Sequence, residues 1–344
     1  MILSITVSRH QIADKLGCTE DRIVEILPVT EFQQHSIKCA ELRPQAEWGF
    51  FSMDMNGVSV SRLRKACAEL YDVIEIFRTV FVSATAGSAL HAVVMSEIQP
   101  DIRVQEVQGS VDAAMQSFFR DDLARGLSPD QSLTAFSIFH KPLTNETRLI
   151  MQMSHAHYDG ISLALIADTL AALYKQGAPP RLGAFSQFIH SSMVRTAADY
   201  QYWREILRGG SMSVGPHDLD GCNDHSGLMD RTKDQFVRGL LHESLGLSEI
   251  VKHCTDWSAE TSYGSTVHYQ NVAEDSFALL EGNRIRLDPV QDSGEADAPG
   301  CTRVTAYPTG SECKLEISMP PKSGVSMARK VLEDLAASIE ILSK

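Results

Sequence analysis

Between residues 133 and 177 the hydrophobic pattern changes from the period of a strand to the period of a helix. Residues 133–140 and 147–155 are apolar runs typical of strands, and the proline and asparagine between them indicate a turn. Directly after Gly160, residues 161–177 carry apolar side chains at helical spacing and end in a glycine. This order predicts a hairpin whose second strand leads straight into a helix.

Strand and helix patterns also alternate in the rest of the chain, which predicts an α/β fold. Helices are expected over residues 58–77 (starting after Gly57), 111–125, 197–210, 234–254 and 331–342. Strands are expected over residues 262–272 and 277–287, with a hairpin of 302–308 and 313–320. Residues 211–233 and 291–300 are rich in turn-forming residues and predict a linker and a loop.

The charge and cysteine content exclude several classes of protein. A net charge of -13 argues against binding to nucleic acid or to anionic membrane surfaces. The basic run RLRK at 62–65 is an exception. We interpret it as the solvent-exposed face of a helix rather than a binding surface for a partner. Seven cysteines without a CxxC pair indicate neither a disulfide framework nor a cysteine zinc site. We find no signal peptide and no apolar run of membrane-spanning length, so a cytoplasmic location is expected.

The sequence SHAHYDG at 154–160 joins the second strand of the hairpin to the helix, and it admits three interpretations. As a metal site, His155, His157 and Asp159 resemble the start of the HxHxDH signature of metallo-β-lactamase-like hydrolases. However, the last histidine is replaced by Gly160, and a zinc site needs three or four protein ligands. As a plain structural element, His155 is a half-buried histidine and Asp159 a turn residue or helix N-cap.

The third interpretation assigns catalysis to His155. An imidazole with a pKa near 6.5 can accept a proton from an amine or hydroxyl that attacks an activated carbonyl. Asp159 would hold the loop through an arginine, and Gly160 would supply backbone freedom for the turn. The pattern HxxxDG is only moderately specific by itself.

The motif and several other segments resemble the condensation domains of nonribosomal peptide synthetases. SHAHYDG is similar to the SHxxxDG variant of the terminal, condensation-like domains of fungal synthetases. Further similar segments are VEILPVTEFQQ at 24–34, FRTVF at 77–81, YWREIL at 202–207 and CTDWSAETSYGSTVHYQN at 254–271. Together these segments cover most of residues 20–210 and 234–344.

The resemblance implies a two-lobed fold like that of chloramphenicol acetyltransferase, with the active site in a tunnel between the lobes. His155 takes the position of the catalytic histidine. The other residues assigned by resemblance are Ser154, Asp159, Gly160 and Arg78 as supports of the site and Gln270, Asn271 and His157 as candidates for the tunnel lining. No metal or nucleotide cofactor is implied. The partner is a peptidyl or acyl carrier protein domain, acting in trans, which supplies the phosphopantetheine arm and its thioester.

The chain departs from this family in length. YWREIL is followed too soon by HESLGL at 242–247, so a stretch of the second lobe is missing around residues 211–233. We therefore divide the chain into an N-terminal lobe (1–184), a crossing helix and linker (185–233) and a partial C-terminal lobe (234–344). A natural shrunken homologue, an engineered or mispredicted chain and a diverged protein with another task all remain open. The loss is expected to expose apolar surface.

Three functions follow from these observations. The first is acyl transfer in fungal secondary metabolism, in which an amine or hydroxyl attacks a carrier-bound thioester, with cyclisation and release when the nucleophile lies in the same peptide. The second is a non-catalytic or repurposed remnant that binds a carrier protein or a small molecule. The third, with little weight, is a zinc hydrolase built on His155 and His157.

Overall fold

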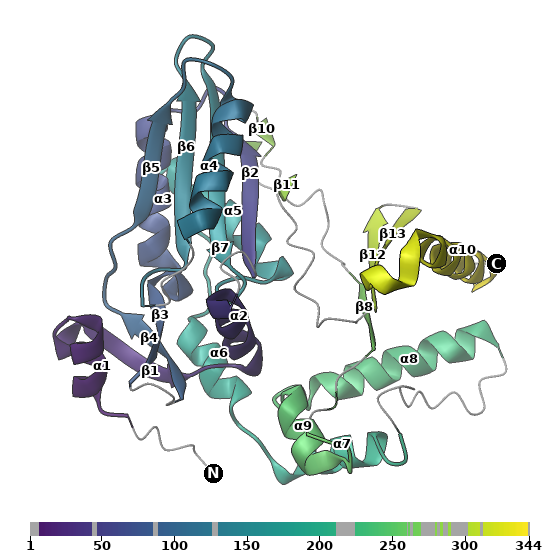
Figure 1. Ribbon diagram of the computed structural model, residues 1–344. Coiled ribbons are helices and arrows are strands. Elements are labelled where there is room, and N and C mark those ends of the chain that lie inside the picture. Colours follow the sequence, from purple (N-terminus) through teal and green to yellow (C-terminus); the bar gives the residue numbers. More distant parts are fainter. Residues whose placement is uncertain are drawn as a thin grey trace. The chain divides into compact units, whose positions relative to one another are not determined.

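The computed structural model divides into two compact units, which are described one at a time (Figure 1). The N-terminal unit consists of residues 3–189 and 272–296, and the C-terminal unit of residues 1–2, 190–271 and 297–344. The structure describes residues 7–42, 47–84, 89–125, 130–210, 224–259, 261, 264–269, 279–280, 283–284, 288–289, 302–309 and 312–342. Among these residues, no helix is long and apolar enough to cross a membrane.

A five-stranded sheet in the order β11-β2-β7-β6-β5 forms the centre of the N-terminal unit. Its strands are β2 (Trp48–Asp54), β5 (Asp101–Glu106), β6 (Thr134–Lys141), β7 (Glu146–Ser154) and β11 (Asp288–Pro289). β5 pairs in parallel with β6, and the other neighbours are antiparallel. The predicted hairpin is confirmed as β6 and β7, and Asn145 in its turn has a positive φ of 53°.

Helices cover both faces of this sheet, because each strand alternates apolar side chains between two cores. On one face, α3 (Val60–Val73) and α5 (Gly160–Tyr174) pack against residues such as Met53, Phe136 and Met151. On the other face, α4 (Val111–Arg125) covers Phe50, Phe139 and Ile150 (Figure 1). The expected helix at 111–125 is confirmed, and the helix at 58–77 is shorter than predicted. It begins after its N-cap Ser59 and gives way to a 3-10 turn, η2 (Glu75–Arg78).

Smaller elements complete the N-terminal unit. A second sheet has the order β1-β4-β3, from β1 (Ile23–Pro28), β3 (Thr79–Ser83) and β4 (Leu90–Met95). The remaining elements are α1 (Arg9–Leu16), η1 (Glu20–Arg22), α2 (Glu31–Leu42), α6 (Phe185–Ser192, which ends in the other unit), β9 (Leu279–Leu280) and β10 (Asn283–Arg284). α1 caps the second sheet by placing Ile12 against Ile23, Val80 and Val93.

The C-terminal unit pairs a helical group with a three-stranded sheet in the order β13-β12-β8. The helices are α7 (Ala197–Ile206), α8 (His225–Leu240), α9 (Leu247–Cys254), η3 (Pro321–Ser323) and α10 (Gly324–Leu342), and the strands are β8 (Ser265–Tyr269), β12 (Thr302–Thr309) and β13 (Glu312–Ser318). Its described core is small, with Leu245, Ile250 and Cys254 packed against side chains of α7.

Two boundaries differ from the sequence-based division. Residues 225–233 are not part of a linker, because Asp224 accepts a hydrogen bond from the Gly227 N–H at 2.7 Å and starts α8 there. Residues 272–296 group with the N-terminal unit, where β11 extends the large sheet beside β2, and not with the C-terminal lobe. The loop expected at 291–300 lies outside the described residues.

Candidate functional site

The SHAHYDG segment forms a tight turn between β7 and α5. Ser154 is the last residue of β7 and is fully buried. Its hydroxyl accepts a hydrogen bond from the Ala156 N–H at 3.2 Å, and its carbonyl accepts one from the His157 N–H at 2.8 Å. Ser154 therefore sets the backbone path that presents His155 at the end of the strand.

The imidazole of His155 is half-buried and lies between two aromatic rings. The ring of Phe32, from α2, lies 5.0 Å from the imidazole centroid, and the ring of Tyr158 lies 4.6 Å from it. The backbone N–H of His155 donates to the carbonyl of Glu47 at 2.7 Å, just before β2 begins. Elements that are distant in sequence thus fix both the backbone and the ring of His155.

Tyr158 is itself held against the large sheet. Its ring makes an edge contact with Phe51 at 5.2 Å. A Cβ atom at Gly49 of β2 would lie 2.4 Å from the Tyr158 hydroxyl and 2.7 Å from the Phe51 ring. Only a glycine at position 49 leaves room for the Tyr158 ring to lie this close to β2. β2 therefore limits where the Tyr158 ring can lie beside His155.

His157 lies inside the N-terminal unit and is only 3% exposed. Its Nε2 lies 3.0 Å from the Thr79 carbonyl, which can only accept, so Nε2 donates there. Its Nδ1 lies 3.0 Å from the Thr134 hydroxyl and is left to accept from it. Burial lowers the pKa of His157 to about 4, so the ring is neutral near pH 7. The expectation that His157 lines an open tunnel is wrong, because both nitrogens are used in the core.

Asp159 is the N-cap of α5, as the structural interpretation of the motif predicted. Its Oδ1 accepts from the Ser162 N–H at 2.7 Å, and the Ser162 hydroxyl accepts from the Asp159 N–H at 2.8 Å, which completes a capping box. Within the described residues, no arginine pairs with the Asp159 carboxylate, so the predicted arginine brace is not present there. Gly160 is the first helical residue of α5, a conformation that does not require glycine.

The metal interpretation of the motif fails on this geometry. His157 has both nitrogens engaged in the core, and the Asp159 carboxylate caps a helix. His155 therefore has neither of the two partners that a zinc site in this segment would need.

Arg78 supports the motif indirectly. Its guanidinium donates to the carbonyls of Tyr71 at 2.7 Å and Met95 at 2.8 Å, which ties the end of α3 to β4. The next residue, Thr79, supplies the carbonyl that holds His157. The FRTVF segment thus anchors the core that holds His157, and the Arg78 guanidinium bonds to backbone carbonyls and not to the Asp159 carboxylate.

Replacing Asp159 with alanine is expected to lower the free energy of unfolding by about 1 kcal/mol, because α5 loses its N-cap. Asparagine at the same position keeps an acceptor for the Ser162 N–H and should restore most of this stability. Urea unfolding of the two variants measures the difference. Equal stability of the alanine and asparagine variants would contradict the capping role.

Several residues of the site were not predicted from the sequence. Phe32 and Gln33 belong to the segment VEILPVTEFQQ, whose family resemblance was a usable signal; the Gln33 amide donates to the Ala156 carbonyl at 3.2 Å. Glu47 contributes a backbone carbonyl, for which the sequence holds no signal. Gln270 and Asn271 lie outside the described residues, so their place in a tunnel stays a prediction.

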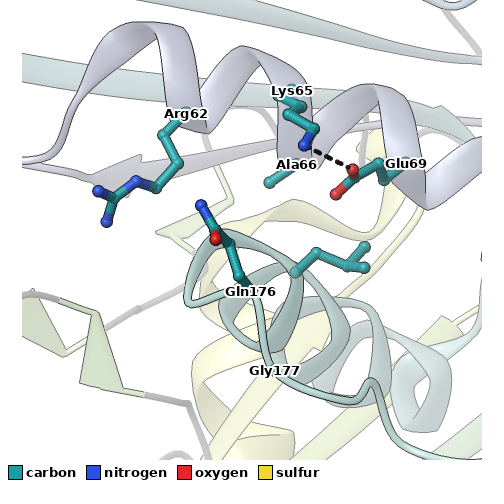
Figure 2. Close-up of a pocket in the computed structure, with 7 residues that line it drawn as sticks. Arg62, Lys65, Ala66, Glu69, Gln176 and Gly177 are labelled. Carbon is teal, nitrogen blue, oxygen red and sulfur yellow. Dashed lines mark ion pairs between the residues drawn. The ribbon is translucent and has the colours of Figure 1, made fainter.

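A separate polar pocket lies between α3 and the end of α5, with a volume of about 310 Å³ (Figure 2). Arg62, Lys65, Glu69 and Gln176 line it, whereas no residue of the motif does. Lys65 pairs with Glu69 at 3.5 Å, and the Arg62 guanidinium lies 5.1 Å from the centre of the Tyr174 ring. The charges of this basic run are thus partly satisfied on the helix surface itself.

Comparison with known proteins identifies relatives in fungi. Residues 26–216, more than half of the chain, match the family described as Condensation domain. The nonribosomal peptide synthetase gloA of Glarea lozoyensis is 24% identical over 425 aligned positions, which cover 97% of this chain and 6% of that protein. The nonribosomal peptide synthetase ungA of Aspergillus violaceofuscus is 30% identical over 230 aligned positions, which cover 65% of this chain and 2% of that protein. The chain thus spans only a small part of these relatives.

Solved structures share the fold. A crystal structure described as a CT mutant superposes with a TM-score of 0.77 at 18% identity, covering 98% of this chain and 95% of that one. The starter condensation domain of the rhizomide synthetase RzmA superposes with a TM-score of 0.68 at 14% identity, and the superposition covers 89% of this chain and 93% of that one. The alignment with gloA is longer than this 344-residue chain, so the relative carries segments that this chain lacks.

Proposed function

Because the chain belongs to the condensation-domain family of nonribosomal peptide synthetases, we propose that it transfers an acyl or peptidyl group from a carrier-bound thioester with His155 as the catalytic base. The observation that carries the proposal is the fixed position of His155 at the turn from β7 to α5. Its backbone bonds to Glu47, and its ring packs between Phe32 and Tyr158. A ring fixed in this way avoids the entropic cost of orienting a base during the reaction.

The proposed reaction forms one bond at the thioester carbonyl and breaks another. An amine or hydroxyl attacks the carbonyl carbon, the new C–N or C–O bond forms, and the C–S bond to the pantetheine arm breaks. His155 accepts the proton of the nucleophile and returns it to the leaving thiolate. A carrier protein domain of a synthetase supplies the thioester, so the chain itself needs no metal or nucleotide for this chemistry.

We assign the nucleophile to the same peptide, so that the reaction closes a ring and releases the product. The fungal relatives, the SHxxxDG form of the motif and the fold shared with the CT structure support this assignment. Attack by a second carrier-bound amine is the other reaction open to the same base.

A repurposed protein that binds a carrier domain without turnover is the second candidate. The observation that favours it is the poorly covered C-terminal unit, in which Phe236 is 67%, Leu241 80% and Val267 81% exposed. A catalytic domain with a complete second lobe would be expected to bury such side chains.

Incubation with a peptidyl thioester decides between the two candidates. The substrate is a linear peptide carried on a holo carrier protein or on an N-acetylcysteamine mimic. Mass spectrometry is expected to show a cyclic product with the mass of the linear acid less one water, and free thiol in equal amount. Carrier binding in a pull-down without any thiol release would instead support the repurposed protein.

A further inference from the structure

Three side chains with metal-binding atoms lie close together beside the SHAHYDG turn, and none of these side chains has a role in the site described above. His35 and Cys39 lie on α2, and Glu47 lies just before β2. One ligand atom from each residue lies within 4.8 Å of the other two. In the described part of the chain, no other three residues with such atoms lie close enough together to hold one ion.

The spacing on α2 suits a shared ion. His35 and Cys39 are four residues apart, so their side chains lie on the same face of the helix. The distance from Cys39 Sγ to His35 Nε2 is 3.4 Å. Two such ligands on one tetrahedral zinc ion, at about 2.3 Å for sulfur and about 2.0 Å for nitrogen, would lie about 3.5 Å apart. The pair is therefore already placed for chelation.

Glu47 provides an independent indication of a cation. The residue is buried, at 7% exposed, and its φ of 62° lies in the left-handed region that a glutamate rarely adopts. Its carboxylate accepts a hydrogen bond from the Ser36 hydroxyl at 3.1 Å. In the described residues, no lysine or arginine pairs with it. Burying a carboxylate away from water costs free energy unless a positive charge or several donors compensate.

We propose that His35, Cys39 and Glu47 bind one transition-metal ion of the zinc type. A nitrogen, a thiolate and a carboxylate oxygen are the ligands that zinc takes in proteins, and three protein ligands leave the fourth position to water. The ion would supply the charge that the Glu47 carboxylate lacks and would join α2 to the start of β2. Both elements hold His155, through Phe32 and the Glu47 carbonyl.

Cobalt(II) titration of the purified chain tests the site without any acyl transfer. Binding is expected to saturate at one ion per chain, with a near-ultraviolet sulfur-to-cobalt charge-transfer band and the intense visible bands of a tetrahedral ion. Zinc should displace cobalt and remove these bands. Cys39→Ser should abolish the charge-transfer band, and His35→Ala and Glu47→Gln should each weaken binding by at least about tenfold.

Cys313→Ser is the matched control, because Cys313 is an exposed thiol on β13. It should keep the full spectrum and affinity. Far-ultraviolet circular dichroism establishes that each variant is folded; where Cys39→Ser does not fold, Cys39→Ala takes its place. The absence of a thiolate band in the wild type, or its persistence in both Cys39 variants, would overturn the site. These results do not depend on whether the chain has condensation activity.

Discussion

Replacing His155 with alanine is expected to reduce the rate of product formation from a carrier-bound or mimic thioester by about 10²–10⁴-fold, the usual contribution of a positioned general base. The variant lacks the group that takes the proton from the nucleophile. The thioester is still bound, so the loss should appear in kcat rather than in KM. Single-turnover assays that follow thiol release and product mass measure the effect.

His10→Ala is the matched control for this experiment. His10 lies on α1, where its side chain is 73% exposed and pairs with Asp14 and Glu20. Its removal should leave turnover unchanged, while circular dichroism should show the same helix content in both variants. Turnover in His155→Ala equal to that of the wild type would remove His155 from the mechanism. Binding of the carrier that survives in a chain without turnover would favour the repurposed protein.

The sequence predicted the N-terminal unit well because its elements carry their own signals. Residues 133–140 and 147–155 are short apolar runs on either side of a turn, which favours a buried hairpin, and the structure contains that hairpin. The apolar stripe that follows Gly160 likewise specifies α5. Periodicity sufficed here because both faces of the sheet are covered by helices of the same unit.

The site was predicted less completely, because contacts between distant segments decide it. The motif named His155, but nothing in the sequence indicates that Glu47 binds its backbone or that Gly49 leaves room for Tyr158. His157 was named as a candidate for the tunnel lining only because it lies in the motif beside His155. The chain turns at residue 155, which sends His157 into the core.

The C-terminal unit shows why residues 211–233 misled the prediction. Turn-forming residues there indicate a loop, yet the capping hydrogen bond of Asp224 starts a helix within the same stretch. α8 then carries apolar residues such as Phe236 and Leu240 that remain exposed, as expected for a lobe that lacks part of its family's length. The helix predicted over 234–254 is present as two helices, α8 and α9, and the core of the described residues in this unit is small.

Acidification below pH 6.5 is expected to destabilise the chain through His157. The folded pKa of His157 is about 4, below the ordinary 6.5, because burial disfavours the charged ring. Above pH 6.5 the ring is neutral in both the folded and the unfolded state, and no stability is lost. As the pH falls from 6.5 to 4, the unfolded chain takes up a proton that the folded chain does not. The free energy of unfolding should therefore fall by about 3 kcal/mol from this group.

His157→Gln separates this effect from the titration of carboxylates, which is common to both chains. At pH 7 the variant should be less stable by about 1–3 kcal/mol, because Thr134 and Thr79 lose well-placed partners in the core. Glutamine cannot be protonated, so the difference should shrink toward pH 4 and reverse if the protonation penalty exceeds the lost hydrogen bonds. Urea unfolding at several pH values measures both curves. Parallel curves would mean that His157 ionises alike in both states, and that burial does not hold the ring neutral in the folded chain.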